Sequence, residues 1–216
     1  MNGSSAGGLS PRMGSMGTNM TARTSTNYPI RVDLVRSHRF PILDRLGITF
    51  APGKTQHHPM SGPKWDRELT QDLARMRGFY GIEILLSLVE DIELEELQIS
   101  DLPAQADRTG IRLIRFPIRD MSVPKDLSAF ASVVSVIVDE LRLNKTVAVH
   151  CKGGLGRAGT VAACICIMAS DWNLTGDDAI ALIRSTRPGT IENITQEDFV
   201  RSFSKQKPKL PVVGAD

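Results

Sequence analysis

The chain has 216 residues, 41% of them apolar, and its 26 lysines and arginines against 24 acids give a formal net charge of +2. This length and composition predict one soluble globular domain with a sizeable core. The near balance of charge excludes a whole-protein attraction to nucleic acid or anionic membrane. No secretory signal or membrane span is visible, so none is expected. Three cysteines are too few for a disulfide framework, which predicts a reducing compartment, the cytoplasm with the nucleus as an alternative.

Both ends of the chain are expected to be flexible. Residues 1–27 are mostly Gly, Ser, Thr, Met and Asn, so they bury too little apolar surface to offset the entropy of ordering. Arg12 and Arg23, with no acid before Asp33, share the bias of organelle transit peptides, but a plain tail is favoured. Residues 205–216 predict a second flexible tail, which leaves 28–204 as the folded domain.

Between the tails, strand patterns alternate with helical periodicity. Strands are predicted at 29–32, 47–50, 82–89, 111–116 and 146–149, and helices at 66–77, 92–97, 124–143, 157–170, 177–184 and 195–203. Residues 82–89 are almost continuously apolar, as in a strand buried on both faces. This alternation predicts an α/β fold, a compact and mainly parallel sheet flanked by helices.

A cysteine, three glycines and an arginine lie between the last predicted strand and the helix after it. The stretch reads His150-Cys151-Lys152-Gly153-Gly154-Leu155-Gly156-Arg157. Phosphoryl transfer to cysteine needs a thiolate, which a helix N-terminus and converging backbone amides favour. The glycines let the loop curl, and Arg157 supplies a planar charged fork that matches phosphate. We therefore predict Cys151 as nucleophile, with residues 152–157 binding the phosphate.

Two other interpretations use the same residues. A cysteine alone beside a glycine-rich turn would be structural, but the complete spacing from Cys151 to Arg157 favours catalysis. Gly154, Gly156 and Gly159 also spell the dinucleotide-binding fingerprint. That fingerprint requires another strand after the helix, and the following residues predict a turn and a helix instead, so the nucleotide interpretation is disfavoured.

A leaving alkoxide or phenoxide needs a proton, so a carboxylic acid is expected over the pocket. Asp120 is the candidate, because it follows a strand expected to neighbour the Cys151 strand. A loop aspartate by itself is more often a turn or cap residue.

The remaining polar features carry weaker predictions. His57 and His58 read as ordinary loop residues without metal partners, and Cys164 and Cys166 face different ways on a helix, as core residues do. The acidic run 90–96 could meet a basic substrate, although acids are common at a helix start. No metal or cofactor is expected.

On these residues the chain resembles the cysteine-dependent protein tyrosine and dual-specificity phosphatases, and most of all the kinase-associated phosphatases that act on cyclin-dependent kinases. The resemblance runs from about Ile30 to Phe203. It includes Leu46-Gly47, Pro52-Gly53-Lys54, the turn from Pro117 to Asp120, the cysteine loop, and Val161-Ala162-Ala163-Cys164. It implies a phosphatase domain over 28–204, without a cofactor, that acts on a phosphorylated protein.

The resemblance also implies roles for individual residues. Cys151 would form the cysteinyl-phosphate, Arg157 would stabilise the transition state, and Asp120 would act as general acid and then as base. Gln196 falls where relatives carry a glutamine that helps to position the hydrolytic water. Ala158 departs from the pattern, because most relatives have Ser or Thr there to hydrogen-bond the departing thiolate. We therefore predict a slowed second step.

Two alternatives stay open at this point. Lys152 beside the nucleophile resembles loops of phosphoinositide phosphatases, although those usually carry more than one basic residue. A non-catalytic module that binds phosphate or a kinase is also conceivable, but the joint presence of Cys151, Asp120 and Arg157 weighs against it.

Overall fold

The computed structural model describes residues 21–56 and 63–207. Its strands are β1 (Asp33–Leu34), β2 (Leu46–Phe50), β3 (Thr55–Gln56), β4 (Trp65–Asp66), β5 (Ile84–Ser87), β6 (Arg112–Arg115) and β7 (Val147–Cys151). Its helices are η1 (Pro41–Arg45, a 3-10 helix), α1 (Leu69–Phe79), α2 (Asp91–Glu96), α3 (Leu102–Arg108), α4 (Leu127–Arg142), α5 (Gly156–Ala169), α6 (Gly176–Thr186) and α7 (Ile194–Ser204). Strands and helices alternate over most of this range.

The main sheet has five strands in the order β1-β2-β7-β5-β6. Only β1 is antiparallel to its neighbour, and β2, β7, β5 and β6 are parallel. The strand that carries the cysteine is therefore central, with Phe50 of β2 opposite Cys151. The predicted α/β fold is confirmed, and ligand chemistry is expected at the carboxyl edge of these strands.

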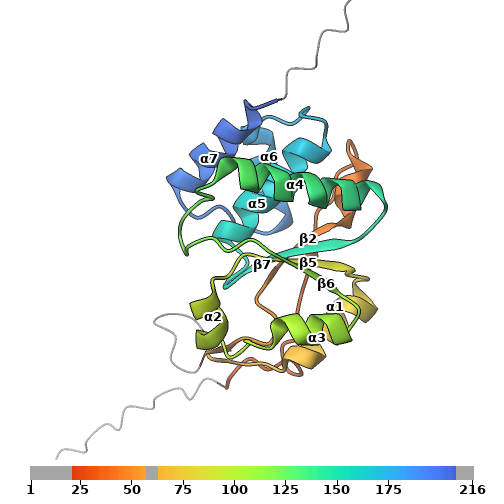
Figure 1. Cartoon of the computed structure of the whole chain (residues 1–216), viewed down its shortest axis with the longest axis vertical. Helices are drawn as coiled ribbons and strands as arrows, with labels where there is room; N and C mark the ends of the chain where they lie inside the picture. Colours follow the sequence, from red (N-terminus) through yellow and green to blue (C-terminus); the bar gives the residue numbers. More distant parts are fainter. Residues whose placement is uncertain (1–20, 57–62, 208–216) are drawn as a thin grey trace, which may run out of the picture.

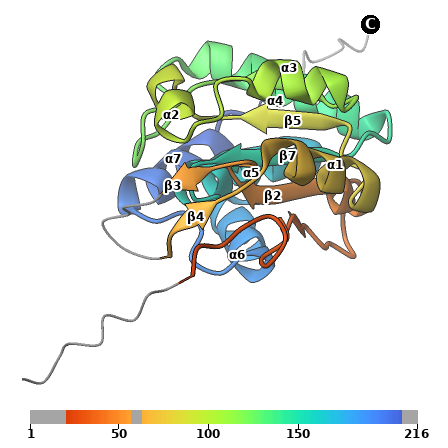
Figure 2. The same cartoon turned by 90° about the horizontal axis from the view of Figure 1, so that it is seen from below.

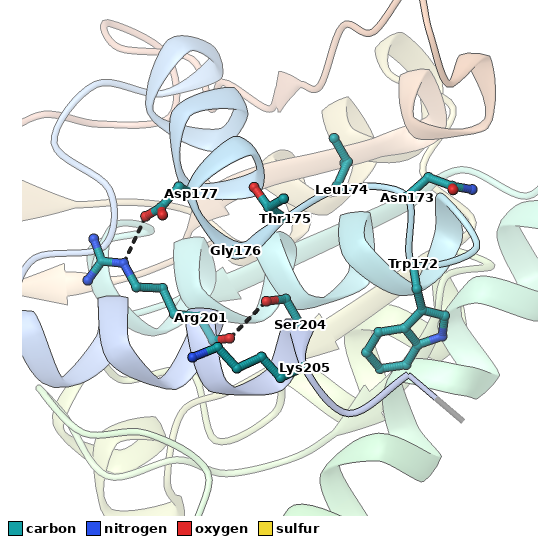
Figure 3. A pocket seen from close by; sticks show the side chains of 9 residues that line it. All are labelled: Trp172, Asn173, Leu174, Thr175, Gly176, Asp177, Arg201, Ser204 and Lys205. Atoms are coloured by element: carbon teal, nitrogen blue, oxygen red, sulfur yellow. Dashed lines mark hydrogen bonds and ion pairs between the residues drawn. The ribbon is translucent and has the colours of Figure 1, made fainter. Parts of the chain in front are cut away.

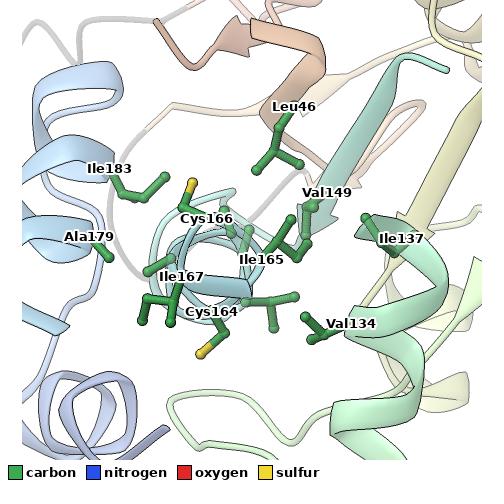
Figure 4. Close-up of a cluster of buried hydrophobic side chains, with 14 of the residues drawn as sticks. Leu46, Val134, Ile137, Val149, Cys164, Ile165, Cys166, Ile167, Ala179 and Ile183 are labelled. Atoms are coloured by element: carbon green, nitrogen blue, oxygen red, sulfur yellow. The ribbon is translucent and has the colours of Figure 1, made fainter. Parts of the chain in front are cut away.

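Two helical layers cover the two faces of the sheet. Figure 1 shows α4, α5, α6 and α7 on one side and α1, α2 and α3 on the other. Nearly every residue of α5 is buried, because α4, α6 and α7 pack around it. Figure 4 shows Cys164 and Cys166 pointing to different sides of α5. Both thiols are buried, which confirms that they are core residues.

The helix starts follow from side-chain capping. Asp126 accepts a hydrogen bond from the Ala129 amide (2.9 Å) and so starts α4 two residues beyond Pro124. Thr175 caps α6 in the same way, and Asn193 caps α7 through the Gln196 amide (3.0 Å). Such caps satisfy amides that the first helical turn leaves unpaired.

Several local predictions were wrong. The predicted tail 1–27 lies mostly outside the described residues, but 21–27 pack on the domain: Arg23 bridges to Trp65, and Thr24 accepts a hydrogen bond from the Arg67 side chain. Figure 2 shows this segment beside β4. The helix predicted at 66–77 begins only at Leu69, because Trp65 and Asp66 pair in the β3–β4 hairpin. The first strand lies at 33–34 rather than 29–32, and α3 was not predicted.

The element order and helix lengths bear on two other predictions, namely the nucleotide-binding interpretation and the expected absence of a membrane span. In the part of the chain that the structure describes, no strand follows α5, so the nucleotide-binding interpretation lacks its second strand. In the same part, no helix is both long enough and apolar enough to cross a bilayer. Residues 205–207 follow α7, and 208–216 lie outside the described residues, as do His57 and His58.

Candidate active site

The cysteine loop turns tightly between β7 and α5. Cys151 ends the strand, and residues 152–155 connect it to the first turn of the helix. Gly154 has a φ of +71°, and a Cβ there would lie 2.4 Å from the Thr49 carbonyl oxygen. The Gly154 amide donates to the Cys151 sulfur at 3.3 Å. Glycine is thus required to bring the loop against β2 with an amide aimed at the thiol.

Arg157 lies in the first turn of α5 with its side chain only 1% exposed. Its Nη1 and Nη2 donate to the two carboxylate oxygens of Glu93 at 2.6 and 2.8 Å, and Nη1 also donates to the Ile118 carbonyl at 2.8 Å. This bidentate pair fixes the plane of the guanidinium beside the loop. The acidic run 90–96 was not expected to hold Arg157, so Glu93 is a site residue that the sequence pattern missed.

The Glu93–Arg157 pair keeps both groups charged. Burial by itself would raise the pKa of the Glu93 carboxyl, but hydrogen bonds from Arg157 and from the Glu90 amide lower it overall. Burial likewise opposes the charge on Arg157, yet hydrogen bonding to Glu93 and the charge of Cys151 raise the arginine pKa overall. A permanent cation therefore lies next to the loop.

Asp120 reaches the site from the segment after β6. Its Oδ1 forms an ion pair with Nη2 of Arg157 at 2.8 Å, and its side chain is 58% exposed. The expectation that its strand neighbours the Cys151 strand was wrong, because β5 lies between β6 and β7. The segment that carries Asp120 nevertheless reaches Arg157, because it continues past the end of β5, where the Ile118 amide donates to the Leu88 carbonyl at 3.0 Å.

Gln196 joins α7 to the cysteine loop. It is fully buried, and its Oε1 accepts from the Glu192 amide (2.8 Å) while its Nε2 donates to the Ser122 carbonyl (3.4 Å). A Cβ at Gly156 would come within 2.8 Å of its amide nitrogen. The glutamine thus lies against the start of α5 and contacts the segment that carries Asp120.

The position after Arg157 has no hydroxyl that could replace the one relatives carry. Ala158 is fully buried. The Thr160 hydroxyl donates to the Gly156 carbonyl at 2.8 Å, within the helix backbone. Because its proton is donated within the helix, the Thr160 hydroxyl does not supply the hydrogen bond that residue 158 lacks.

His150 precedes the nucleophile and is completely buried. Burial lowers its pKa to about 4, so the ring is neutral at physiological pH. Its Nδ1 lies 3.4 Å from the Cys151 carbonyl oxygen. A neutral ring at this place adds no charge that would compete with Arg157.

Three basic residues surround the outer side of the loop. Lys152 lies 3.4 Å from a Glu96 oxygen on α2, and Arg187 donates to the Gly153 carbonyl at 3.2 Å. Lys54 donates to the Lys152 carbonyl at 3.3 Å. Lys54 and Arg187 were not predicted as site residues, since they come from distant segments that only the sheet topology brings together.

Other features do not compete with this site. The cleft in Figure 3 lies between the start of α6 and the end of α7, and an Arg201–Asp177 ion pair crosses it. It contains none of the predicted site residues. Across residues 21–56 and 63–207, no group of three or more His, Cys, Asp and Glu is placed to hold a metal ion.

The chain matches one family model and several known proteins. Residues 59–200 match the model described as "PTP-SAK: Swiss Army Knife protein, DSP-PTPase phosphatase domain". Protein tyrosine phosphatase domain-containing protein 1 of Mus musculus is 35% identical over 111 residues, which cover 51% of this chain and 14% of that protein. Cyclin-dependent kinase inhibitor 3 of Rattus norvegicus is 28% identical over 138 residues, 63% of this chain and 64% of the relative. The match thus spans a small part of the first protein and just under two thirds of the second.

The fold has a close counterpart among solved structures. The crystal structure of kinase associated phosphatase, with its catalytic-site cysteine substituted by serine, superposes with a TM-score of 0.70 at 22% identity. The superposition covers 82% of this chain and 94% of the other.

Proposed function

The chain belongs to the PTP-SAK family of dual-specificity-type phosphatase domains, and from this premise we propose that it is a phosphoprotein phosphatase that works through a cysteinyl-phosphate. The observation that carries the proposal is the convergence on one loop: an amide aimed at the Cys151 sulfur, and Arg157 fixed by Glu93 beside Asp120. Fixed donors of this kind stabilise charge that develops in a transition state without reorganisation.

The first step transfers the phosphoryl group to sulfur. The Cys151 thiolate attacks phosphorus, an S–P bond forms and the P–O bond to the leaving group breaks. Asp120 gives its proton to the leaving oxygen, while the loop amides and Arg157 hold the three equatorial phosphoryl oxygens. The chemistry needs no metal ion, because the amides and the guanidinium supply the electrostatic stabilisation.

The second step hydrolyses the intermediate. Asp120, now a carboxylate, takes a proton from water, which attacks phosphorus and releases inorganic phosphate as the S–P bond breaks. Gln196 helps to orient this water. The departing sulfur receives no hydroxyl hydrogen bond from residue 158, so this step is the slower one, and product from the first step should appear as a burst.

The substrate we propose is a phosphorylated protein, with phosphotyrosine first and phosphoserine or phosphothreonine as further targets. Similarity to cyclin-dependent kinase inhibitor 3 and to kinase associated phosphatase makes a cyclin-dependent kinase the first partner to test. A phosphoinositide is the alternative substrate for the same chemistry, suggested by Lys152 beside the nucleophile.

A generic aryl phosphate assay tests the mechanism. Cys151→Ser should abolish turnover, and Asp120→Ala should lower kcat with little change in KM. Activity that survives Cys151→Ser in chelator-treated buffer would overturn the mechanism, and a wild-type chain without turnover would favour the non-catalytic binding module. A panel of phosphopeptides and phosphoinositides then separates the two substrate classes.

A further inference from the structure

Lys54 is a buried lysine that reaches the cysteine loop from the segment after β2. It is only 5% exposed. Its Nζ lies 3.9 Å from the centre of the Trp65 ring and 4.8 Å from that of Phe50, and it donates to the Lys152 carbonyl at 3.3 Å. Two aromatic faces and one loop carbonyl therefore hold the ammonium next to the residue that follows the nucleophile.

Lys54 differs from the other cations around it. Its charged neighbours are Cys151, Arg67, Arg187 and Lys152. The three basic neighbours each have a carboxylate partner, namely Asp72, Asp33 and Glu96 respectively. Among the described residues no carboxylate forms an ion pair with Lys54, so Cys151 is the one member of this set that becomes an anion when it ionises.

Because Lys54 is buried and has no carboxylate partner among the described residues, its protonation state changes near neutral pH. Burial lowers the pKa of Lys54 from its ordinary 10.5 to about 7, although the charge of Cys151 works in the opposite direction. A buried ammonium without a carboxylate partner disfavours the folded state, and an anion beside it offsets that cost. The anions that this loop would hold are a thiolate and a phosphate.

We propose that Lys54 is a positioning residue of the active site, whose ammonium stabilises the Cys151 thiolate and holds the loop through the Lys152 carbonyl. The inference rests on the proposed function, in that Cys151 is the nucleophile. The stabilisation is strongest below about pH 7, where Lys54 is protonated, and it fades at higher pH as Lys54 loses its proton.

Alkylation of Cys151 by iodoacetamide tests this without any turnover. The rate follows the thiolate population, and mass spectrometry locates the label. Cys164 and Cys166 are buried in α5, and burial raises the pKa of Cys166 to about 12. They should not be alkylated between pH 5 and 9, so the dependence of the alkylation rate on pH reports Cys151 alone.

Lys54→Met should move the midpoint of the alkylation profile upward by about one pH unit, which is a roughly tenfold slower reaction at pH values well below both midpoints. The difference from wild type should vanish near pH 8.5. Lys54→Arg, which keeps the charge, should restore most of the rate in that same pH range. Lys145→Met is the matched control, because it removes the same charge from the opposite end of β7, where Lys145 pairs with Glu83.

Two results would overturn the inference. One is an alkylation profile of folded Lys54→Met that coincides with that of wild type. The other is a loss of alkylation rate that is equal at all pH values, as a purely structural role of Lys54 would give. Lys54→Gln provides a second uncharged variant should the methionine variant not fold. A shifted profile in a chain that hydrolyses no phosphate ester would retain the inference and reject the proposed function.

Discussion

Glu93 offers the sharpest test of how the site is held together. Its carboxylate forms a bidentate pair with Arg157, and the two side chains are 7% and 1% exposed. Its Oε2 also accepts from the Glu90 amide at 3.0 Å, which closes a capping box at the start of α2. Glu93→Ala removes all these contacts at once and leaves a buried guanidinium without its main partner.

The expected loss of stability is large. Removal of one member of a buried ion pair costs about 3–5 kcal/mol, because the remaining charge is uncompensated. Asp120 offers little compensation, since its side chain is mostly in solvent. Glu93→Gln keeps the volume and one acceptor, so its loss should be about 2 kcal/mol. In both variants the guanidinium is less well oriented, and kcat/KM toward an aryl phosphate should fall about 100-fold.

Urea unfolding followed by circular dichroism gives the free energies, and steady-state kinetics gives kcat/KM. Glu95→Ala is the matched control, because Glu95 lies on the same helix but is exposed, and its free energy of unfolding should change by less than about 0.5 kcal/mol. A Glu93→Ala protein within about 1 kcal/mol of wild type, with kcat/KM within about threefold, would refute the reasoning.

Three further variants test separate parts of the site. Ala158→Ser should abolish the burst in rapid-mixing kinetics by speeding the second step; a trace that is linear from time zero in wild type would sink this account. Gly154→Ala should lower the free energy of unfolding by about 1–3 kcal/mol in urea melts, because of the positive φ and the contact with Thr49. His150 has a pKa of about 4 in the folded chain, so between pH 6.5 and 4 the unfolded chain binds more protons and stability falls by about 3 kcal/mol. About 2 kcal/mol of this loss falls between pH 7 and 5, where urea melts should show it in wild type and in His38→Asn but not in His150→Asn. The same loss in His150→Asn as in wild type would contradict the burial argument.

The cysteine loop could be predicted because it is contiguous. Cys151, the glycines and Arg157 satisfy separate chemical requirements within one turn of chain, and the flanking strand and helix have clear patterns. Asp120 could be chosen on chemistry, yet the reason given for its placement was wrong, since strand order does not follow from periodicity. The segment reached the site by continuing along β5, a tertiary contact.

Glu93 and Lys54 show why the rest of the site was not predicted. An acid in the first turn of a helix has an ordinary explanation, and nothing local in the sequence says that it is buried against Arg157. Lys54 acquires its properties from Trp65 and Phe50, which meet only when the β3–β4 hairpin forms beside β2. Likewise, residues 21–27 have a tail-like composition but gain order from the cation–π contact of Arg23 with Trp65.

The central place of β7 in the sheet also has a consequence for how the active site forms during folding. Both neighbours of β7, β2 and β5, precede it by long stretches of sequence, and parallel strands with such connections close slowly. Until β7 inserts, β2 and β5 have unpaired edges, and Cys151 is an ordinary thiol on an unfolded segment. The reactivity proposed for that thiol therefore requires the completed sheet, and the rate at which it appears during refolding would report when β7 joins β2 and β5.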